Sequence, residues 1–461
     1  MSATDQPVAP LRSRSSPDQQ VLNSTLIKAS FVGALGGLLF GFDTAVIAGT
    51  EPSLITLYHL TAWSTGLTVS IALIGTVIGA MTSGVIGQKF GSREVLRVLA
   101  VLYLLSAVGC AFAPSWTVLL AARFIGGLGI GGSSVLGPVY IAEISPAKWR
   151  GRLVGLFQIN IVAGILLAYL SNYLIARAIT GPTDWRWMFG VAAVPALLFL
   201  IFLFGIPQSP RWLATQNRVE EAHSVLQSIG SPDPGAELRE IVASIHLDRT
   251  TASEPLFSRK YAFPMFIAVT MGMFNQLAGI NAILYYLTPI FTYAGFTRMS
   301  AELQSVAVGG MNFAATFLGM ALIDKLGRKT LLLIGSAGMV GCLSGVAYVF
   351  LANSHQSSLL WLLLVYIAFF SISQGAVIWV YIGEVFPNRV RAKGQGLGSS
   401  SHWIMNAAIS LTFPLLAVKS HGYPFVFFAA MTLVQFFVVL FVYPETKGIS
   451  LEQMQHKLGI E

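Results

Sequence analysis

Apolar stretches of about 20 residues, a length that spans a bilayer, recur about twelve times along this chain. We place their starts near residues 26, 64, 94, 117, 151, 185, 259, 300, 329, 357, 392 and 423. One long polar stretch, residues 209–258, follows the sixth apolar run. The pattern predicts an all-α membrane protein with twelve transmembrane helices in two bundles of six, residues 26–208 and 259–445.

Three short patterns occur twice, at offsets of 241, 236 and 237 positions. They pair residues 143–150 with 384–391, residues 89–93 with 325–329, and Pro207 with Pro444. Nearly equal offsets across half of the chain indicate an internal duplication, which is typical of transporters when the chain consists of membrane helices. We therefore expect the two bundles to be related by pseudo-symmetry.

Charge is sparse and unevenly distributed. Of 461 residues, 54% are hydrophobic and only 10% are charged, and 23 of the 28 Lys and Arg residues fall in the two tails and in the loops after even-numbered spans. The positive-inside rule places these segments in the cytoplasm. We therefore expect a multi-pass protein of the plasma (inner) membrane with both termini inside. The net charge of +8 reflects this asymmetry and does not indicate a nucleic-acid partner.

The duplicated patterns place charged residues at the cytoplasmic ends of both bundles. We expect them to form an ion-pair network that clamps the two halves together when the protein opens outward. The residues of this predicted gate are Glu143, Arg93, Arg150, Arg152, Asp324, Arg328, Glu384 and Arg391. Helix capping and topology signalling are an alternative role, which does not exclude the clamp.

Three polar segments lie outside the spans. Residues 1–25 lack the apolar core of a cleavable signal, so we expect a disordered cytoplasmic tail, and residues 446–461 form a second tail. In the linker, Ser209 before a proline is typical of a helix start. Helical spacing then predicts one amphipathic helix over 210–229 and a shorter one over 238–245.

Asp43 is the only acidic residue that we place deep within a span, and Arg123 is the only basic one. A buried carboxylate is costly unless it is neutralised or paired, so such residues are functional candidates. A nearby cation favours the ionised carboxylate, whereas an isolated dry site favours the acid. A change in the distance between the two side chains would therefore bind and release a proton. The alternative is a permanent structural ion pair.

The seventh apolar run carries several polar side chains, among them Asn275, Gln276, Asn281 and Tyr285. Asn281 and Tyr285 share a helix face, whereas Gln276 lies about 140° from Asn281 on an ideal helix. Gly279 between them would allow local unwinding, as in the discontinuous helices that line transport sites. We predict a substrate site here, and the alternative is hydrogen bonding between helices.

Other spans supply amides and aromatic rings. These groups suit a neutral, polyhydroxylated ligand, because amides both donate and accept hydrogen bonds while rings cover C–H surfaces. The candidates are Gln158, Asn312, Trp379, His402 and Asn406. His402 has no second ligand at metal spacing, so we expect it to make a polar contact and not to bind a metal.

Enzyme motifs are missing from the sequence, which has neither a P-loop nor a nucleophile elbow. The glycine-rich segment 126–132 lies within the fourth span, where helix packing explains it better than phosphate binding. We therefore expect no enzyme activity, no cofactor, and an ion gradient as the energy source.

Seven motifs make residues 28–452 similar to the sugar porter family of the major facilitator superfamily. They are GFDTAVIAGT (41–50), RFIGGLGIG (123–131), PVYIAEISPAKWRGRL (138–153), PQSPRWL (207–213), QLAGINAILYY (276–286), DKLGRK (324–329) and PETKG (444–448). The resemblance implies the major facilitator fold, and it implies sugar contacts at Gln158, Gln276, Asn281, Asn312, Trp379 and Asn406. It also implies proton coupling, because Asp43 matches the acidic residue of bacterial xylose–proton symporters. Animal facilitative glucose carriers have a neutral residue there.

Four positions depart from the family pattern. Asn275 replaces the first residue of a usual Gln-Gln pair, and His402 stands where Asn or Gln is common, so the particular sugar stays open. Gln88 and Gln208 replace acidic residues of the gate motifs, so we expect a weaker gate in the N-terminal half.

These observations together predict a monomeric transporter that imports a neutral monosaccharide, a hexose or a pentose, by proton symport with alternating access. Its partners would be the sugar, protons and the lipid bilayer. Two alternatives stay open: a proton-independent facilitative uniporter of the same fold, and a non-transporting sugar sensor.

Overall fold

Twelve spans of the computed structural model are long and apolar enough to cross a membrane. Each begins within two residues of the start predicted from the sequence, so the prediction of twelve spans is confirmed. The structure describes residues 22–179, 181–250, 254–387, 389–449, 451–458 and 460. Most of the predicted N-terminal tail, residues 1–21, lies outside the described residues.

The first six spans form the N-terminal half, in which the sixth span is divided at Ala192. Its helices are α1 (Ser24–Tyr58), α2 (Ala62–Phe90), α3 (Ser92–Ala111), α4 (Trp116–Ile144), α5 (Arg150–Ala178), α6 (Asp184–Val191) and α7 (Ala193–Leu203).

The last six spans form the C-terminal half, in which the seventh and tenth spans are divided. Its helices are α11 (Ala262–Leu277), α12 (Ile280–Tyr285), α13 (Leu287–Tyr293), α14 (Arg298–Leu326), α15 (Arg328–Leu351), α16 (Leu359–Ile372), α17 (Gln374–Glu384), α18 (Arg391–Lys419), α19 (Tyr423–Phe441) and the terminal α20 (Leu451–Lys457). Short 3-10 turns, Arg259–Tyr261 and Gln356–Ser358, precede α11 and α16.

The linker between the halves contains three helices, α8 (Pro210–Thr215), α9 (Val219–Ser228) and α10 (Pro234–Thr250). Ser209 caps the first as predicted, because its hydroxyl accepts a hydrogen bond from the Trp212 N–H at 3.1 Å. The prediction of one continuous helix over 210–229 is wrong, since Asn217 takes a left-handed conformation with φ of 61° and separates α8 from α9. The predicted helix over 238–245 is part of the longer α10.

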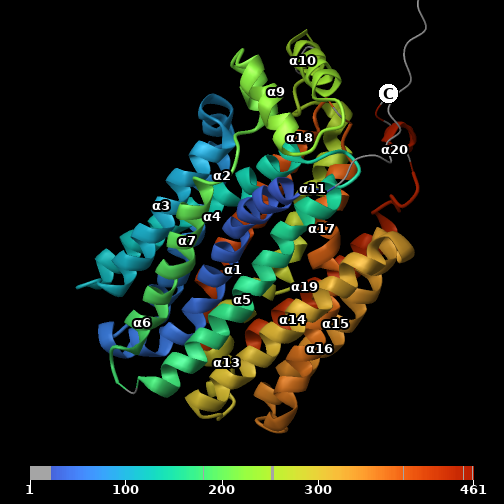
Figure 1. Cartoon of the computed structure of the whole chain (residues 1–461). Coiled ribbons are helices and arrows are strands. Elements are labelled where there is room, and N and C mark those ends of the chain that lie inside the picture. Colours follow the sequence, from blue (N-terminus) through green and yellow to red (C-terminus); the bar gives the residue numbers. More distant parts are fainter. Residues whose placement is uncertain are drawn as a thin grey trace, which may run out of the picture.

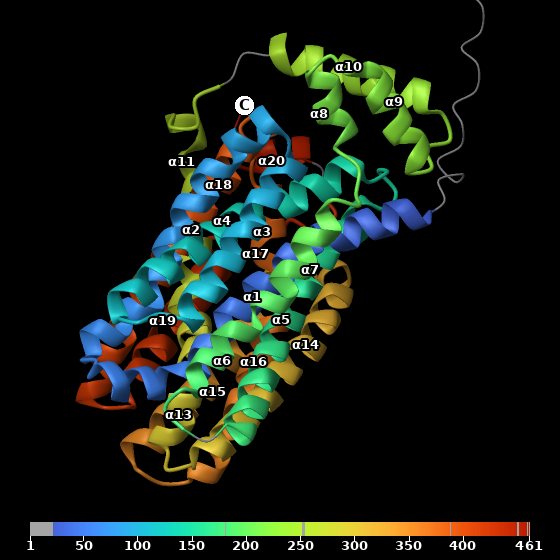
Figure 2. The same cartoon turned by 60° about the vertical axis from the view of Figure 1, so that its left-hand side comes forward.

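Both ends of the described chain lie at the end of the bundle that carries the linker helices (Figures 1 and 2). Asn23, just before α1, donates a hydrogen bond to the Ser228 carbonyl of α9 at 2.8 Å. Met454 of α20 lies in one apolar cluster with Leu331 near the start of α15. We call this end the linker face, and the opposite end, where α6 and α14 begin, the distal face.

Small residues let the helices approach closely. The two halves meet along α2 against α18 and along α5 against α14. A Cβ atom on Gly66 of α2 would lie 2.2 Å from the Leu411 carbonyl oxygen of α18. Within the N-terminal half, a Cβ atom on Gly127 would lie 1.9 Å from the Ala72 carbonyl oxygen. The interpretation of segment 126–132 as a packing surface is therefore confirmed.

The seventh span is broken at Gly279, as the sequence predicted. Helix α11 ends at Leu277, Gly279 has φ of 88°, and α12 begins at Ile280. A side chain at Gly279 would be strained by this left-handed conformation. It would also be crowded, because its Cβ would lie 2.3 Å from the Phe428 ring of α19. The break therefore depends on glycine.

We expect Gly279→Ala to destabilise the protein by about 1–3 kcal/mol, because the new Cβ adds backbone strain and a clash with Phe428. A thermal-shift assay in detergent should show a lower melting temperature. Gly310→Ala is the matched control, since no heavy atom lies within 4 Å of a Cβ built at this helical glycine. An equally small effect of both substitutions would contradict the requirement for glycine at 279.

Candidate functional site

The break in the seventh span brings together predicted sugar-binding amides that an ideal helix would separate. Asn281 of α12 donates from Nδ2 to Gln276 Oε1 at 3.1 Å. Gln276 donates from Nε2 to Asn275 Oδ1 at 3.1 Å, and the same nitrogen lies 3.2 Å from His402 Nε2 on α18. Four of the predicted residues therefore form one polar cluster.

His402 in this cluster is flanked by two indole rings. Its ring centroid lies 5.2 Å from that of Trp379 and 5.0 Å from that of Trp403. His402 is 8% exposed, whereas Trp379 is 41% exposed. The Trp379 ring therefore keeps surface that the C–H groups of a sugar can cover.

Asn406 connects α18 to α12. It is fully buried, its Nδ2 donates to the Tyr285 hydroxyl at 3.2 Å, and its Oδ1 accepts from the Ser410 hydroxyl at 3.3 Å. Tyr285 and Asn406 are thus satisfied by each other in the interior of the bundle, where water does not supply hydrogen bonds.

Two predicted sugar contacts do not join this network. Asn312 of α14 accepts a hydrogen bond from the Ser371 hydroxyl of α16 at 2.8 Å. Gln158 of α5 is half-buried, and no hydrogen bond connects it to the described residues of the cluster. Contact of a sugar with these two side chains stays a prediction.

The structure brings Asp43 and Arg123 together, as the proton-coupling hypothesis requires. Arg123 Nη1 lies 3.6 Å from Asp43 Oδ1. Arg123 also donates from Nε to the Thr68 carbonyl of α2 at 3.1 Å, so its position does not depend on Asp43 alone. Arg123 is 3% exposed and its Nη1 lacks a hydrogen-bond partner among the described residues. A permanent pair and a pair that separates are both compatible with this geometry.

A cavity of about 10 Å³ next to this pair is shared with Tyr285, and it is lined by Phe40, Asp43, Thr44, Val69, Ala72, Leu73, Arg123, Ile130, Tyr285 and Trp403. It has room for about one water molecule and not for a sugar. Tyr285 therefore lines the cavity of the ion pair and also accepts a hydrogen bond from Asn406 of α18.

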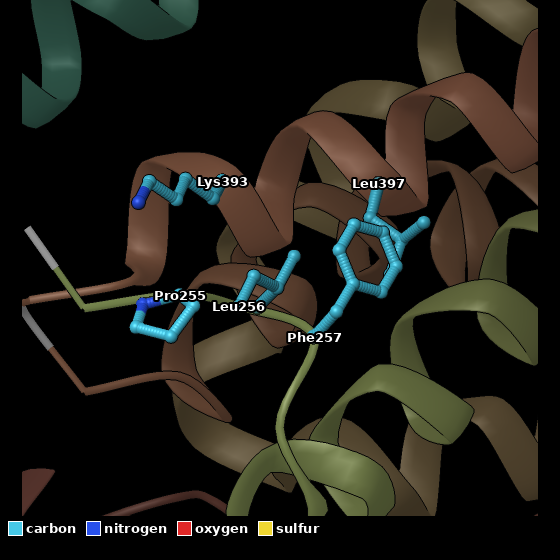
Figure 3. Close-up of a pocket in the computed structure, with 5 residues that line it drawn as sticks. All are labelled: Pro255, Leu256, Phe257, Lys393 and Leu397. Carbon is cyan, nitrogen blue, oxygen red and sulfur yellow. The ribbon is translucent and has the colours of Figure 1, made fainter.

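A second cavity, of about 420 Å³, lies elsewhere (Figure 3). It is formed by the segment before α11 and the first turns of α18, and it is lined by Pro255, Leu256, Phe257, Lys393 and Leu397. None of the predicted sugar contacts lines it.

The predicted gate of the C-terminal half is centred on Arg328 at the linker face. Its Nη2 donates to Glu384 at 2.9 Å, and its Nη1 lies 3.1 Å from Asp324. The Thr446 hydroxyl donates to the second Glu384 oxygen at 2.7 Å. Glu384 is therefore held by two partners from different segments of the same half.

Glu445, outside the spans, caps the start of α15. Its carboxylate accepts hydrogen bonds from the backbone N–H groups of Arg328 and Lys329 at 3.0 and 3.1 Å. The N–H groups of Thr446 and Lys447 each donate to it at 2.9 Å. Partial burial opposes ionisation, but these four hydrogen bonds hold the pKa of Glu445 below its ordinary value. A helix N-terminus favours an anion in this place.

The N-terminal half repeats this gate without the arginine at the start of the third span, and the cation that faces Glu143 is Arg211 of α8. Ser92 stands at the position that Arg328 occupies in the other half. Glu143 therefore lies near the Ser92 and Ser209 hydroxyls, and one of its oxygens has no hydrogen-bond partner among the described residues. The weaker gate expected in this half stays a prediction, and Ser92 is a further reason for it.

Other contacts of the duplication are kept. The Tyr140 hydroxyl donates to the Pro207 carbonyl at 2.7 Å, and the Tyr381 hydroxyl donates to the Pro444 carbonyl at 2.6 Å. Gln208 stands where the other half has Glu445, and its side-chain oxygen accepts a hydrogen bond from the Ser209 N–H at 3.0 Å.

The remaining gate residues contact groups within their own half. Arg93 pairs with Glu94, Arg150 binds the Ala142 carbonyl, Arg152 lies over the Trp149 ring and Arg391 binds the Phe386 carbonyl. The ion pairs that the structure describes at the linker face lie within one half or join it to the linker. A clamp between the halves in an outward-open state stays a prediction.

Sequence reasoning missed charged residues near the distal face. Glu51 of α1 and Glu302 of α14 are two further buried acidic residues, 3% and 0% exposed, that the sequence analysis did not single out. Arg298 of α14 pairs with Asp184 of α6 at 2.7 Å. Both glutamates lie towards the ends of apolar runs, where the hydrophobic pattern does not distinguish a buried carboxylate from an exposed one.

Comparison with known proteins gives a consistent result over nearly the whole chain. Residues 29–458 match the family described as Sugar (and other) transporter. The chain is 37% identical to the glucose transport protein of Synechocystis sp., covering 95% of this chain and 99% of the relative. It is 36% identical to the D-xylose-proton symporter of Escherichia coli (strain K12), covering 95% and 96%. The inward-open structure of the E. coli xylose transporter XylE matches with a TM-score of 0.84 at 34% identity, covering 94% of this chain and 99% of that chain. The major facilitator fold implied by the motifs is therefore confirmed.

We expect Gln276→Ala and Asn281→Ala each to weaken sugar binding by about 1–3 kcal/mol, or about 5- to 150-fold, because each removes hydrogen bonds at the cluster. Tryptophan fluorescence of Trp379 and Trp403 should report the titration with the best ligand of a hexose and pentose panel. Gln435→Ala is the control, since this buried amide pairs with Gln374 outside the cluster. Unchanged affinity in both variants would place the sugar elsewhere.

We expect Glu445→Gln to lower stability by about 1 kcal/mol, because a charged cap of α15 becomes neutral. The difference from the unmodified protein should be present above the ordinary carboxyl pKa, near 4.3, and should disappear as the pH falls through the lower pKa of the folded state. Thermal shifts across pH would measure it. Asp324→Asn, which removes an 80%-exposed partner of Arg328, should have a smaller effect.

Proposed function

Because the chain belongs to the sugar transporter family, we propose that it imports a neutral monosaccharide, a hexose or a pentose, together with a proton by alternating access. The linker face would be cytoplasmic, since basic residues gather in its loops. The distal face would then open to the outside of the plasma (inner) membrane. The sugar would bind mainly to the C-terminal half, and Asp43 of the N-terminal half would carry the proton.

The observation that supports coupling most directly is the position of Tyr285. Its ring lines the small cavity beside Asp43 and Arg123, and its hydroxyl accepts a hydrogen bond from Asn406. A sugar hydroxyl that accepted the hydrogen bond of the Asn406 amide would remove this hydrogen bond from the Tyr285 hydroxyl. The Tyr285 side chain could then change its position next to the ion pair. Sugar occupancy and protonation of Asp43 would then alter each other's free energy, which is the definition of coupling between two sites.

The amide cluster supplies the chemistry for a neutral sugar. Asn275, Gln276 and Asn281 satisfy one another within the membrane interior, where an unpaired amide would be costly. Sugar hydroxyls donate and accept, so they can replace these hydrogen bonds without leaving a group unpaired. Arg and Lys side chains that would favour an anionic substrate do not occur among the described residues of the cluster.

Asp43 and Arg123 supply the chemistry for the proton. The guanidinium stays charged, so only Asp43 changes its protonation. Their separation of 3.6 Å is longer than a charge-assisted hydrogen bond of about 2.7–2.9 Å. Because Arg123 keeps its bond to the Thr68 carbonyl, it stays in place when Asp43 takes up a proton. The neutral acid is then free to move with α1.

We expect Asp43→Asn to abolish uphill sugar accumulation while exchange of labelled sugar continues. The Asn side chain is similar in size and polarity to Asp, but it cannot take up or release a proton. In proteoliposomes with one pH unit across the membrane, the unmodified protein should accumulate sugar up to about tenfold for a one-proton stoichiometry. The variant should reach equal concentrations on both sides.

Glu51→Gln is the control, since Glu51 is a second buried carboxylate of α1 away from Arg123, and accumulation should persist. Accumulation that survives Asp43→Asn would exclude coupling through Asp43. Exchange without accumulation in the unmodified protein would favour the uniporter, and no uptake of any hexose or pentose would overturn the monosaccharide assignment.

A further inference from the structure

A single arginine joins the two halves at the distal face. Arg298, the first residue of α14, lies 2.7 Å from Asp184 Oδ2 at the start of α6 and donates to the Gly49 carbonyl of α1 at 3.0 Å. Asp184 is 3% exposed, and its other oxygen accepts from the Ser53 hydroxyl at 2.9 Å. This contact is therefore part of the closure between the halves, and it has to break when the distal face opens.

Glu302 lies one helical turn after Arg298, on the same face of α14. It is 0% exposed, and neither carboxylate oxygen has a hydrogen-bond partner among the described residues. The nearest cation, Arg298, is already paired with Asp184. The closure thus contains two carboxylates and one guanidinium.

Among the described residues, the groups that face Glu302 supply no second positive charge. The charged and titratable groups that face Glu302 are Arg298 on its own helix, Asp184 from α6 and Tyr169 from α5. The Tyr169 hydroxyl donates to the Leu284 carbonyl at 2.7 Å, so its hydrogen is already used. The Thr288 hydroxyl of α13 also lies near Glu302, and it is uncharged. An ionised Glu302 would leave one net negative charge buried in the closure, which is costly unless a proton neutralises it.

We propose that Glu302 is a second proton-binding site, occupied when the distal face is closed and emptied when it opens. Closure buries the carboxyl and commits Arg298 to Asp184, so Glu302 takes up a proton. Opening separates Arg298 from Asp184 and lets water reach the carboxyl, which then ionises. The inference rests on the alternating access of the proposed function, but it does not need Asp43 to carry a proton.

Glu302 is separate from the site of sugar and proton coupling. It lies ten residues before Asn312, which is about 15 Å along α14. It belongs to the contact between the halves at the distal face. Its proton would exchange with the distal side each time that face opens. Glu302 would therefore set the balance between closed and open states according to the distal pH without adding to the number of protons transported per sugar.

The sign of the effect follows from this linkage. Acid favours the protonated, closed state, and a higher pH favours the open state. In the pH range where the closed state holds this proton and the open state does not, the ratio of closed to open molecules should change by up to about tenfold per pH unit.

The test measures closure directly. Spin labels at Trp63→Cys on α2 and Ser357→Cys before α16, with Cys110 and Cys342 replaced by Ala, report the distance between the halves at the distal face. Double electron–electron resonance between pH 5 and 8 should show that the fraction of molecules with the short distance between the labels increases as the pH falls. A distance distribution that does not change with pH would overturn the proposal.

Three variants test whether the pH dependence of closure arises from Glu302. Glu302→Gln should remove it and keep the closed population high at every pH, because the neutral amide imitates the protonated acid. Asp184→Asn should also reduce it, since Arg298 can then neutralise Glu302 without a proton; this second variant keeps the test decisive where Glu302→Gln folds poorly. Arg298→Gln should steepen the response, because two buried carboxylates then lack a cation.

Two controls separate this proposal from neighbouring ones. Asp43→Asn should retain the pH response of closure, so failure of coupling through Asp43 and failure of the Glu302 proposal give different results. Glu51→Gln should retain it as well, although Glu51 is also buried near the distal face. A response that survives Glu302→Gln and disappears in Glu51→Gln would overturn the assignment.

Discussion

The structure depends on one constraint: within a bilayer, every polar group of a helix has to find its partner in the protein. The amide cluster of Asn275, Gln276 and Asn281 meets it through mutual hydrogen bonds. Arg123 meets it in part, through the Thr68 carbonyl and Asp43, while its Nη1 lacks a hydrogen-bond partner among the described residues. In the proposed function, a sugar would replace hydrogen bonds of the amide cluster, and a proton would bind to Asp43.

Broken helices make these pairs possible. The turn at Gly279 changes the direction of α12 relative to α11, and side chains that a regular helix would point apart meet at 3.1 Å. Close packing around the turn, with Phe428 where a Cβ would stand, holds it in place. A local backbone feature thus determines which amides face one another, and Tyr285 at the end of α12 lies beside Asp43.

The two halves share a scaffold and divide the chemistry. The Tyr140–Pro207 and Tyr381–Pro444 contacts are nearly identical, and they hold the same corner in each half. In contrast, Ser92 stands where Arg328 would pair with the carboxylate, and Glu143 faces Ser92, Ser209 and Arg211 in its place. The proton pair lies in the N-terminal half and the amide cluster in the C-terminal half. In the proposed function, one movement of the two halves would therefore act on both the sugar and the proton.

The sequence by itself determined the twelve spans, the break at Gly279 and most residues of the amide cluster, because bilayer thickness and glycine geometry act locally along the chain. It did not determine that Gln276 would bond Asn281, that Tyr285 would line the cavity beside Asp43, or that Glu302 would be buried next to an arginine already paired with Asp184. It also suggested one linker helix where Asn217 divides two. These contacts join residues from different helices, so they depend on how the helices turn and pack, and only the tertiary structure decides that.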